Sequence, residues 1–372
     1  MYIAYGVLAI MLVAMGRQLL IAGRLFHPPR YSSKLGQEID LPSVSVCIPA
    51  RNEQHALTDC LDRVLASTYP RLEIIVLDDV SRDTTPALIK SFASEGVRFV
   101  QGVPLPKGWL GKNHALSGLL KEASGTFVLF MDVDTRLAPQ AIEHTVRYAL
   151  SQRAAMVSVL PRREDGWRAS VVASPLRYFW ELIFHRKAAP ATASNAWLIR
   201  REALLQRFQG FETLKSAIQP EATIAAELSA SGDYRFLMST ADFGVGYEKK
   251  WRSQLLTSIR LFSPLLGNQV ALGIVAVFDL LLLLVPFIGA LWGVLSGVYL
   301  VFALGVVLSI GFCATYGWYA RRMWRRGWVV GALAWPLLLV QEIALIMASF
   351  IKYKRSTVTW KDRTIHQPVA RS

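Results

Sequence analysis

The sequence has 372 residues, a formal net charge of +14, a hydrophobic fraction of 53% and a mean hydropathy of +0.32. This composition is too apolar for an ordinary soluble protein, and the excess is concentrated towards the two ends of the chain. Many basic residues flank the apolar segments, which indicates contact with anionic lipid headgroups, and no nucleic-acid partner is expected. The three cysteines show no paired spacing, so no disulfide framework is expected.

The first apolar segment, residues 1–23, is long enough for one transmembrane span. It has no charge before the apolar run, and no small-residue cleavage site follows it. We therefore expect an uncleaved membrane anchor rather than a signal peptide. Residues 24–43 are predicted to form a basic linker after it.

Residues 44–248 show alternating strand and helix patterns. Apolar runs in 43–53, 72–86 and 97–100 each precede a helical pattern, as when Leu57, Leu61 and Val64 recur at i, i+4 and i+7. This order predicts an α/β fold with a mostly parallel sheet, and ligands bind such sheets at the carboxyl ends of their strands.

The segment FVLFMDVDT, residues 127–135, is a further apolar strand that ends in two acids. Side chains at i and i+2 of an extended segment point to the same side, so Asp132 and Asp134 are expected to face one hard cation, Mg2+ or Mn2+. The alternative is a pair of solvated acids at a strand end. Likewise, Lys112 in GWLGKNHAL is either part of the site or a solvated loop lysine.

Taken in order, these motifs resemble those of family 2 glycosyltransferases with the GT-A fold, over residues 44–250. The resemblance implies that the PARNE loop and Asp79 contact the base of a nucleotide sugar, with UDP as the expected nucleotide. It implies that Lys112 lies near this donor, and that Asp132 and Asp134 hold its ribose and its metal-bound diphosphate. The expected donor-binding residues are Pro49, Ala50, Arg51, Glu53, Asp79, Lys112 and Asp132; the expected metal ligands are Asp134 and Asp132.

One residue departs from the family pattern at the turn after the second strand. Val80 stands where the family's DDGS motif has a glycine. A β-branched residue disfavours positive φ, so the conformation of this turn is open.

The general base of the family is the Asp of an E-D pair at the start of a helix. When the helix PEATIAAELSASG is aligned on Gly232, Glu221 takes the position of that Asp and Pro220 that of the Glu. Glu221 is therefore the expected catalytic base, with Glu212 and Asp233 as alternatives. The structural alternative is an acid that only stabilises the first helical turn through the helix dipole.

Residues 249–268 are predicted to form a basic amphipathic helix that lies in the membrane interface, with Trp251, Leu255, Leu256, Ile259 and Phe262 as its apolar face. Packing against the catalytic domain is the alternative. Trp251 and Arg252 are expected to contact the lipid acceptor. The QxxRW motif of processive relatives is absent here, which favours a single addition over polymer synthesis.

About three further spans are predicted in residues 270–351: two in 270–318, broken near Gly289–Gly293, and one in 328–351. With the first segment this makes four. Basic residues after the first and third spans indicate a cytoplasmic side there, but four crossings would then place the basic tail, 352–372, outside. Either the last segment is re-entrant around Pro336 or the count is off by one.

The TVTWKDR stretch in this tail resembles the WKGR-type ending of membrane-bound family 2 enzymes that act on carotenoids and related polyisoprenoids. This resemblance implies that the tail is cytoplasmic and that Trp360 lies near the acceptor.

These expectations together describe an integral protein of the cytoplasmic (inner) membrane with a cytoplasmic catalytic domain. It would be an inverting, metal-dependent, non-processive hexosyltransferase that moves one sugar from a nucleotide sugar to a lipid acceptor, such as a carotenoid or glycolipid. Two alternatives remain open: an inactive homologue that serves as a membrane scaffold, and a nucleotidyl or phosphoryl transferase on a related sheet.

Overall fold

The computed structural model describes residues 2–26, 40–164, 174–324, 326–360 and 363–364. The chain folds into two compact units. The sheet unit comprises 40–164 and 185–248. The helical unit comprises 2–26, 174–184 and the described residues from 249 onwards.

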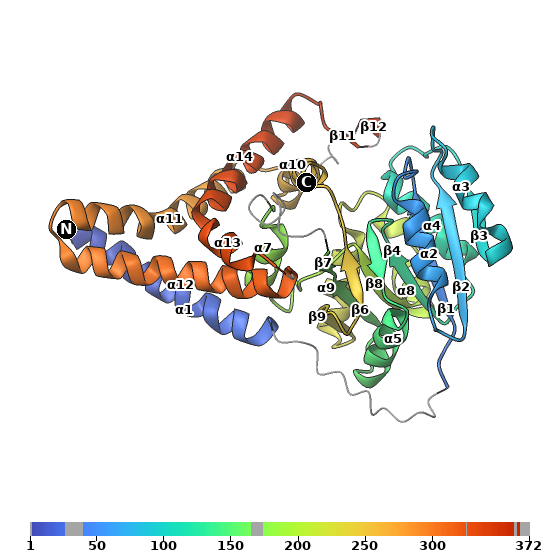
Figure 1. Ribbon diagram of the computed structural model, residues 1–372. Helices are drawn as coiled ribbons and strands as arrows, with labels where there is room; N and C mark the ends of the chain where they lie inside the picture. Colours follow the sequence, from blue (N-terminus) through green and yellow to red (C-terminus); the bar gives the residue numbers. More distant parts are fainter. Residues whose placement is uncertain (1, 27–39, 165–173, 325, 361–362, 365–372) are drawn as a thin grey trace. The chain divides into compact units, whose positions relative to one another are not determined.

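The sheet unit is built around a seven-stranded sheet in the order β3-β2-β1-β4-β8-β6-β9 (Figure 1). Its strands are β1 (Val44–Ala50), β2 (Leu72–Asp78), β3 (Val97–Gln101), β4 (Phe127–Met131), β6 (Met156–Leu160), β8 (Ala196–Arg200) and β9 (Tyr234–Met238). The first four in space are parallel to one another, and β8 is antiparallel to both of its neighbours. Because β9 is parallel to β6, the sheet is mostly parallel, and the predicted α/β fold class is confirmed.

Helices cover both faces of this sheet because the side chains of its strands alternate between two cores. In β1, Val46 and Ile48 join one core and Cys47 joins the other. The first core contains side chains of α2 (Leu57–Leu65), α3 (Thr85–Ser91) and α5 (Ala141–Ser151). The second contains side chains of α4 (Gly111–Glu122), α8 (Arg201–Phe208) and α9 (Pro220–Ala230). Two 3-10 turns complete the unit, η1 (Ala93–Glu95) and η2 (Glu212–Leu214).

A second, three-stranded sheet follows the carboxyl end of β4. Its strands are β5 (Thr135–Leu137), β10 (Val245–Tyr247) and β7 (Arg162–Arg163), with β10 in the middle. The segment between β4 and β5 therefore connects two sheets, which fixes both of its ends.

The helical unit contains α1 (Tyr2–Leu25), α7 (Arg177–Ile183), α10 (Trp251–Leu265), α11 (Val270–Leu295), α12 (Tyr299–Met323), α13 (Trp328–Leu333) and α14 (Trp335–Lys354), with the short strands β11 (Thr359–Trp360) and β12 (Arg363–Thr364). Four of these helices are long and apolar enough to cross a membrane, namely α1, α11, α12 and α14. By length and composition this is the number predicted from the sequence.

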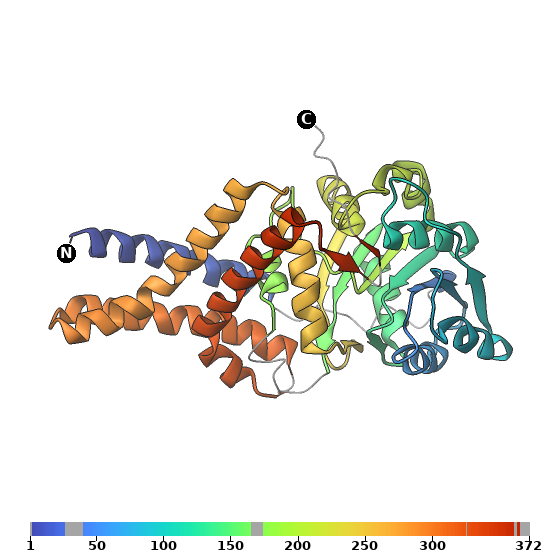
Figure 2. The same cartoon turned by 90° about the horizontal axis from the view of Figure 1, so that it is seen from above.

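The predicted break between the second and third spans was wrong. The helix α11 continues through Gly289 and Gly293, and the chain turns only at 296–298, where Gly297 adopts a φ of 69°. Glycines inside the helices instead permit close packing of α11 against α12 near the turn that connects them, beyond which the two helices diverge (Figure 2). A Cβ atom on Gly305 would lie 2.6 Å from the backbone nitrogen of Ala290.

The last predicted span is divided in the structure. The short helix α13 ends before Ala334, and α14 begins at Trp335 with Pro336 in its first turn, where proline is tolerated. The twenty residues of α14 alone are long enough for a span.

The apolar face predicted for residues 249–268 is only partly correct. In α10, Trp251 and Leu256 are exposed, but Phe262 is buried. The buried face also contains polar residues, because α10 packs on α14: Ser349 Oγ accepts a hydrogen bond of 2.9 Å from the Ser263 nitrogen. The prediction was only partly correct because side chains of α14 hydrogen-bond to the backbone of α10 on this face, and the spacing of apolar residues alone does not reveal such a contact.

We expect Gly305→Ala to destabilise the helical unit by about 1–3 kcal/mol, because the new methyl group meets backbone atoms that cannot move aside. Gly289→Ala is the matched control, since its Cβ would have no neighbour closer than 3.9 Å. Thermal unfolding in detergent should show a lower midpoint for the first variant only. Equal midpoints would contradict close packing at Gly305.

Candidate active site

The loop after β1 and the turn after β2 form one hydrogen-bonded structure. The Asp79 nitrogen donates to the Ala50 carbonyl at 2.8 Å, and Asp79 itself is buried. The Arg51 guanidinium donates to the carbonyl oxygens of Asp79 and Val80. Arg51 was predicted to contact the donor, but its side chain is 6% exposed and binds the protein's own backbone, so it holds the turn in place.

Further bonds connect the same two segments. The Asn52 nitrogen donates to Ser81 Oγ, and the Arg82 nitrogen donates to Asn52 Oδ1, both at 2.9 Å. The Glu53 nitrogen donates to Thr85 Oγ1 at 2.8 Å. The predicted donor-binding residues Pro49, Ala50 and Glu53 thus lie at or just after the carboxyl end of β1, beside Asp79 at the end of β2.

Val80 adopts a φ of 56°, so the left-handed conformation expected of a glycine is present with a β-branched residue. Such a conformation costs about 1–3 kcal/mol for a residue other than glycine. The two Arg51 hydrogen bonds act on the carbonyls on both sides of this position and hold the strained turn.

Asp132 and Asp134 lie in the connection from β4 to β5. The sequence argument assumed an extended segment, but the Thr135 nitrogen donates to the Asp132 carbonyl at 3.0 Å, which makes this a turn. Even so, Val133 between the two acids is buried in the core, while Asp132 and Asp134 are each partly exposed. Both carboxylates are therefore accessible at the carboxyl edge of the sheet.

Lys112 is not a solvated loop lysine. It lies in the first turn of α4, and its Nζ atom is 2.7 Å from Asp132 Oδ1 and 3.5 Å from the Ser194 carbonyl. Each of the two side chains is 28% exposed. The pair therefore places a cation at the carboxyl edge of the sheet, where Asp79 follows β2 and Asp132 and Asp134 follow β4.

The residues after 185 hold the Asp132 turn from the other side. The Asn195 carbonyl accepts hydrogen bonds from the Asp132 nitrogen at 3.0 Å and from Thr135 Oγ1 at 2.8 Å. In the same loop, the Ala191 nitrogen donates to His185 Nδ1 at 2.9 Å. Burial lowers the pKa of His185, so its ring is neutral at pH 7 and is not a second cation of the site.

Sequence reasoning missed Asn113. Its side chain is 1% exposed, and its Nδ2 atom donates to the carbonyls of Leu214 and Ala217 at 2.7 and 2.8 Å. These carbonyls lie at the end of η2 and in the loop that leads from it into α9. Asn113 therefore connects the helix that carries Lys112 to the segment that precedes the helix of Glu221; its place next to Lys112 in GKNHAL was the only signal in the sequence.

Glu221 lies in the first turn of α9 and is 2% exposed. The helix α9 runs back along the sheet before β9, so its first turn lies towards the carboxyl edge. Asp233 follows the other end of α9 and precedes β9, at the opposite edge, and it pairs with Arg207 at 3.2 Å. This position contradicts the use of Asp233 as the base.

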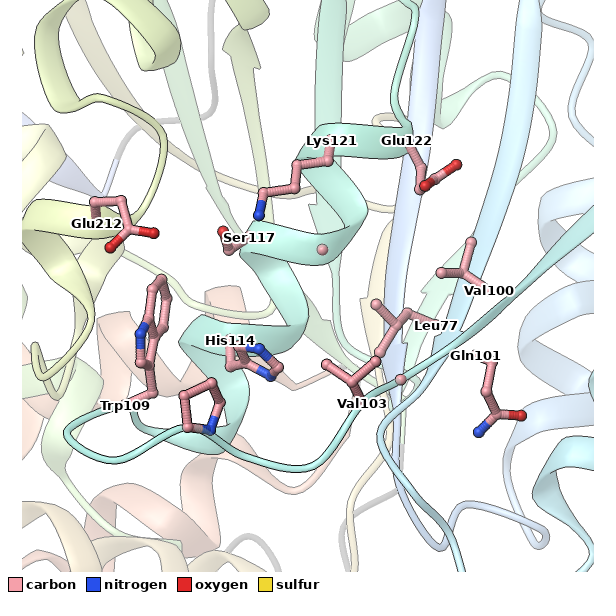
Figure 3. A pocket seen from close by; sticks show the side chains of 13 residues that line it. Leu77, Val100, Gln101, Val103, Trp109, His114, Ser117, Lys121, Glu122 and Glu212 are labelled. Carbon is pink, nitrogen blue, oxygen red and sulfur yellow. The ribbon is translucent and has the colours of Figure 1, made fainter.

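Glu212, the other alternative, lines a pocket of about 350 Å³ beside α4 (Figure 3). Ser117 and Lys121 of α4, together with Trp109, lie near it in that view. Lys112 is not among the lining residues, so Glu212 faces a different side of α4 from the Lys112–Asp132 pair. Glu221 is left as the best placed of the three candidates.

The predicted acceptor residues belong to the helical unit. Trp251 and Arg252 form the start of α10, with the guanidinium carbon 5.6 Å from the centre of the indole ring. Trp360 is in β11, and its side chain lies outside the described part of the structure. Their expected role in acceptor binding stays a prediction.

The fold is shared with a solved structure, that of the mannosyltransferase PcManGT from Pyrobaculum calidifontis in complex with GDP-Man and Mn2+. The TM-score is 0.54 at 18% identity, and the match covers 94% of this chain and 98% of that one. The mostly parallel sheet, with acids and a lysine at its carboxyl edge, therefore has the GT-A fold.

The particular family follows from the sequence. Residues 45–212 match the model of glycosyl transferase family 2, so the chain carries a family 2 glycosyltransferase domain. Undecaprenyl-phosphate 4-deoxy-4-formamido-L-arabinose transferase from Shewanella sediminis is 25% identical over 295 residues, which cover 73% of this chain and 83% of that protein. The enzyme of the same name from Pectobacterium carotovorum is 30% identical over 129 residues, and the match spans 39% of its length. These matches do not favour the scaffold or the nucleotidyl transferase alternatives.

We expect Val80→Gly to stabilise the sheet unit. Relief of the strained φ returns about 1–3 kcal/mol, and the greater freedom of glycine in the unfolded chain costs about 0.4–1 kcal/mol, so a net gain of about 1 kcal/mol remains. Val103→Gly is the control, because Val103 is an exposed valine of a nearby loop without positive φ. A midpoint of thermal unfolding that rises for Val80→Gly and not for Val103→Gly supports the strain; a fall for Val80→Gly argues against it.

Proposed function

We propose that this glycosyltransferase moves a single sugar from a nucleotide sugar to a hydrophobic lipid at the membrane surface, with inversion at the anomeric carbon. The observation that carries the proposal is the convergence of Asp79, Asp132, Asp134 and Lys112 at one edge of the sheet, in a chain with four helices apolar enough to span a membrane. The names of the Shewanella and Pectobacterium relatives support a lipid-linked acceptor.

The donor's base would contact the connected loops after β1 and β2, where Asp79 lies, and its ribose would contact Asp132 and Asp134. Arg51 holds the turn there through its two hydrogen bonds, and its contact with the donor stays a prediction. UDP is the nucleotide we propose. Lys112 stands at the edge where the diphosphate would lie, and a compact cation there opposes the negative charge that grows as the leaving group departs.

A divalent cation fits the residues present. Among the described residues there is no group of three His, Cys, Asp or Glu side chains that could hold a metal by themselves. Mg2+ and Mn2+ commonly take one or two protein carboxylates and complete their shell with water and substrate phosphates. Asp134 is the main ligand we propose; Asp132 contributes its second oxygen, because Lys112 already contacts Oδ1. When bound, such an ion supplies Lewis-acid stabilisation of the diphosphate leaving group.

Glu221 is the proposed general base for a hydroxyl acceptor. Its place in the first turn of α9, towards the carboxyl edge of the sheet, suits a carboxylate that removes a proton from the incoming hydroxyl. Pro220 gives this turn a fixed φ, and Asn113 anchors the loop before it, so the carboxylate is held in position.

A second candidate acceptor is a lipid phosphate, which the name of the Shewanella relative favours. A phosphate oxygen is already ionised at neutral pH and needs no base. The two acceptor classes therefore differ in whether Glu221 is required, which makes its substitution informative.

We expect Asp134→Asn to lower transfer about 100-fold or more, because it removes the main carboxylate proposed for the cation. Asp62→Asn, an exposed acid of α2, is the matched control and should transfer normally. Activity can be followed by mass spectrometry of lipid extracts after incubation with a panel of nucleotide sugars. Full activity of Asp134→Asn, or of the wild type in excess EDTA, would falsify metal dependence.

For a hydroxyl acceptor, we expect Glu221→Gln to lower transfer about 100-fold or more, while donor binding persists. Glu221→Asp keeps a basic carboxylate and should retain part of the activity. Glu227→Gln, on an exposed position of the same helix, controls for effects on α9. If Glu221→Gln transfers as fast as the wild type, the hydroxyl mechanism is wrong and the lipid phosphate becomes the better acceptor.

A further inference from the structure

A groove of about 510 Å³ lies between α12 and α13 in the helical unit. Its walls are almost entirely apolar, and a single charged residue, Arg321, stands among the residues that line it. The lining residues are Ser309, Ile310, Cys313, Ala314, Gly317, Trp318, Arg321, Trp328, Ala332 and Leu333. A volume of this size falls within the range of small-molecule sites, about 300–1,000 Å³.

The groove has the length of one leaflet of a bilayer. From Ser309 to Arg321 the helix rises by about 18 Å, at about 1.5 Å per residue. Half of the hydrocarbon core of a membrane is about 15 Å thick. Arg321 lies in the last turn of α12, which has the length and hydropathy of a span, so the apolar part of the groove matches the depth that one lipid chain occupies.

The charged end of the groove, at Arg321, is suited to bind the headgroup of a lipid. The Arg321 guanidinium lies 5.7 Å from the centre of the Trp328 ring, which restricts its position. No Asp or Glu occurs between Asp279 and Glu342, so no acidic residue of α12 or α13 neutralises this cation. Arg322 and Arg326 add positive charge close by in the sequence. Guanidinium groups bind phosphates well because their N–H groups match phosphate oxygens in pairs.

We propose that this groove binds one anionic phospholipid of the surrounding bilayer, with an acyl chain along α12 and its phosphate on Arg321. The complementarity of charge and the length of one leaflet favour this occupant over a neutral lipid or a soluble phosphate. The site is separate from the proposed catalytic residues, and it does not depend on the identity of the sugar acceptor.

Direct binding tests the proposal. The full chain is purified in neutral detergent, stripped of lipid and mixed with phosphatidylglycerol or phosphatidylcholine; native mass spectrometry then counts the bound lipids. We expect one phosphatidylglycerol per chain at low lipid concentration, and binding of phosphatidylcholine at least fivefold weaker. Equal binding of the two lipids would overturn the role of Arg321.

Matched variants locate the site. Arg321→Gln should weaken phosphatidylglycerol binding at least fivefold, the loss expected when one arginine near a lipid phosphate is removed. Arg322→Gln should not, because Arg322 is in the same helical turn but does not line the groove. Ala314→Trp fills the groove from an exposed position and should abolish binding, whereas Val307→Trp, exposed on α12 outside the groove, should leave it intact. Equal losses for both members of either pair would place the lipid elsewhere.

Cys313 gives an independent readout. It lines the groove and is partly exposed, while the other two cysteines, Cys47 and Cys60, are buried. Phosphatidylglycerol should slow the reaction of Cys313 with a maleimide, and this protection should be absent in Arg321→Gln. If the lipid acceptor of the enzyme removes bound phosphatidylglycerol in a competitive manner, the groove belongs to the acceptor and the proposal of a bilayer lipid is wrong.

Discussion

The ion pair between Lys112 and Asp132 is the interaction on which the candidate active site depends. It connects the first turn of α4 to the turn between the two sheets, and both side chains stay partly exposed. A lone carboxylate at this edge would repel a diphosphate, and a lone lysine would be free to move. Together they fix each other's position and leave the second oxygen of Asp132 available.

The backbone around this pair is held by bonds between segments distant in sequence. The Asn195 carbonyl holds the Asp132 turn, Asn113 holds the loop before Glu221, and Arg51 holds the strained turn at Val80. In each case one polar side chain or carbonyl binds the backbone of another loop. Binding sites on parallel sheets are built from such loops, so their rigidity has to come from bonds of this kind.

The helical unit is held together mainly by close packing, because its helices have few polar groups that could hydrogen-bond to one another. Glycine at Gly305 lets α12 approach α11 until backbone atoms are in contact. Between α12 and α13 the packing is looser and leaves an apolar groove with one cation. The same helix thus presents a tightly packed face and a face that is open to lipid.

Periodicity and composition determined the fold class, the number of apolar helices and the residues at the carboxyl ends of β1, β2 and β4, because alternation of strand and helix and long apolar runs are local signals. The sequence showed that Val80 replaces the glycine of the family motif but left the conformation of that turn open, and the structure gives it a φ of 56°. Only the tertiary structure showed that Arg51 binds its own backbone, that Phe262 is buried against a neighbouring helix and that Asp233 lies at the wrong edge of the sheet. The hydrogen bonds of Asn113 and the turn at Asp132 were likewise revealed only by the tertiary structure. The physical reason is that hydrogen bonds between loops, and the contacts of one helix with another, join residues separated by tens of positions, and no local pattern records which partner each side chain will meet.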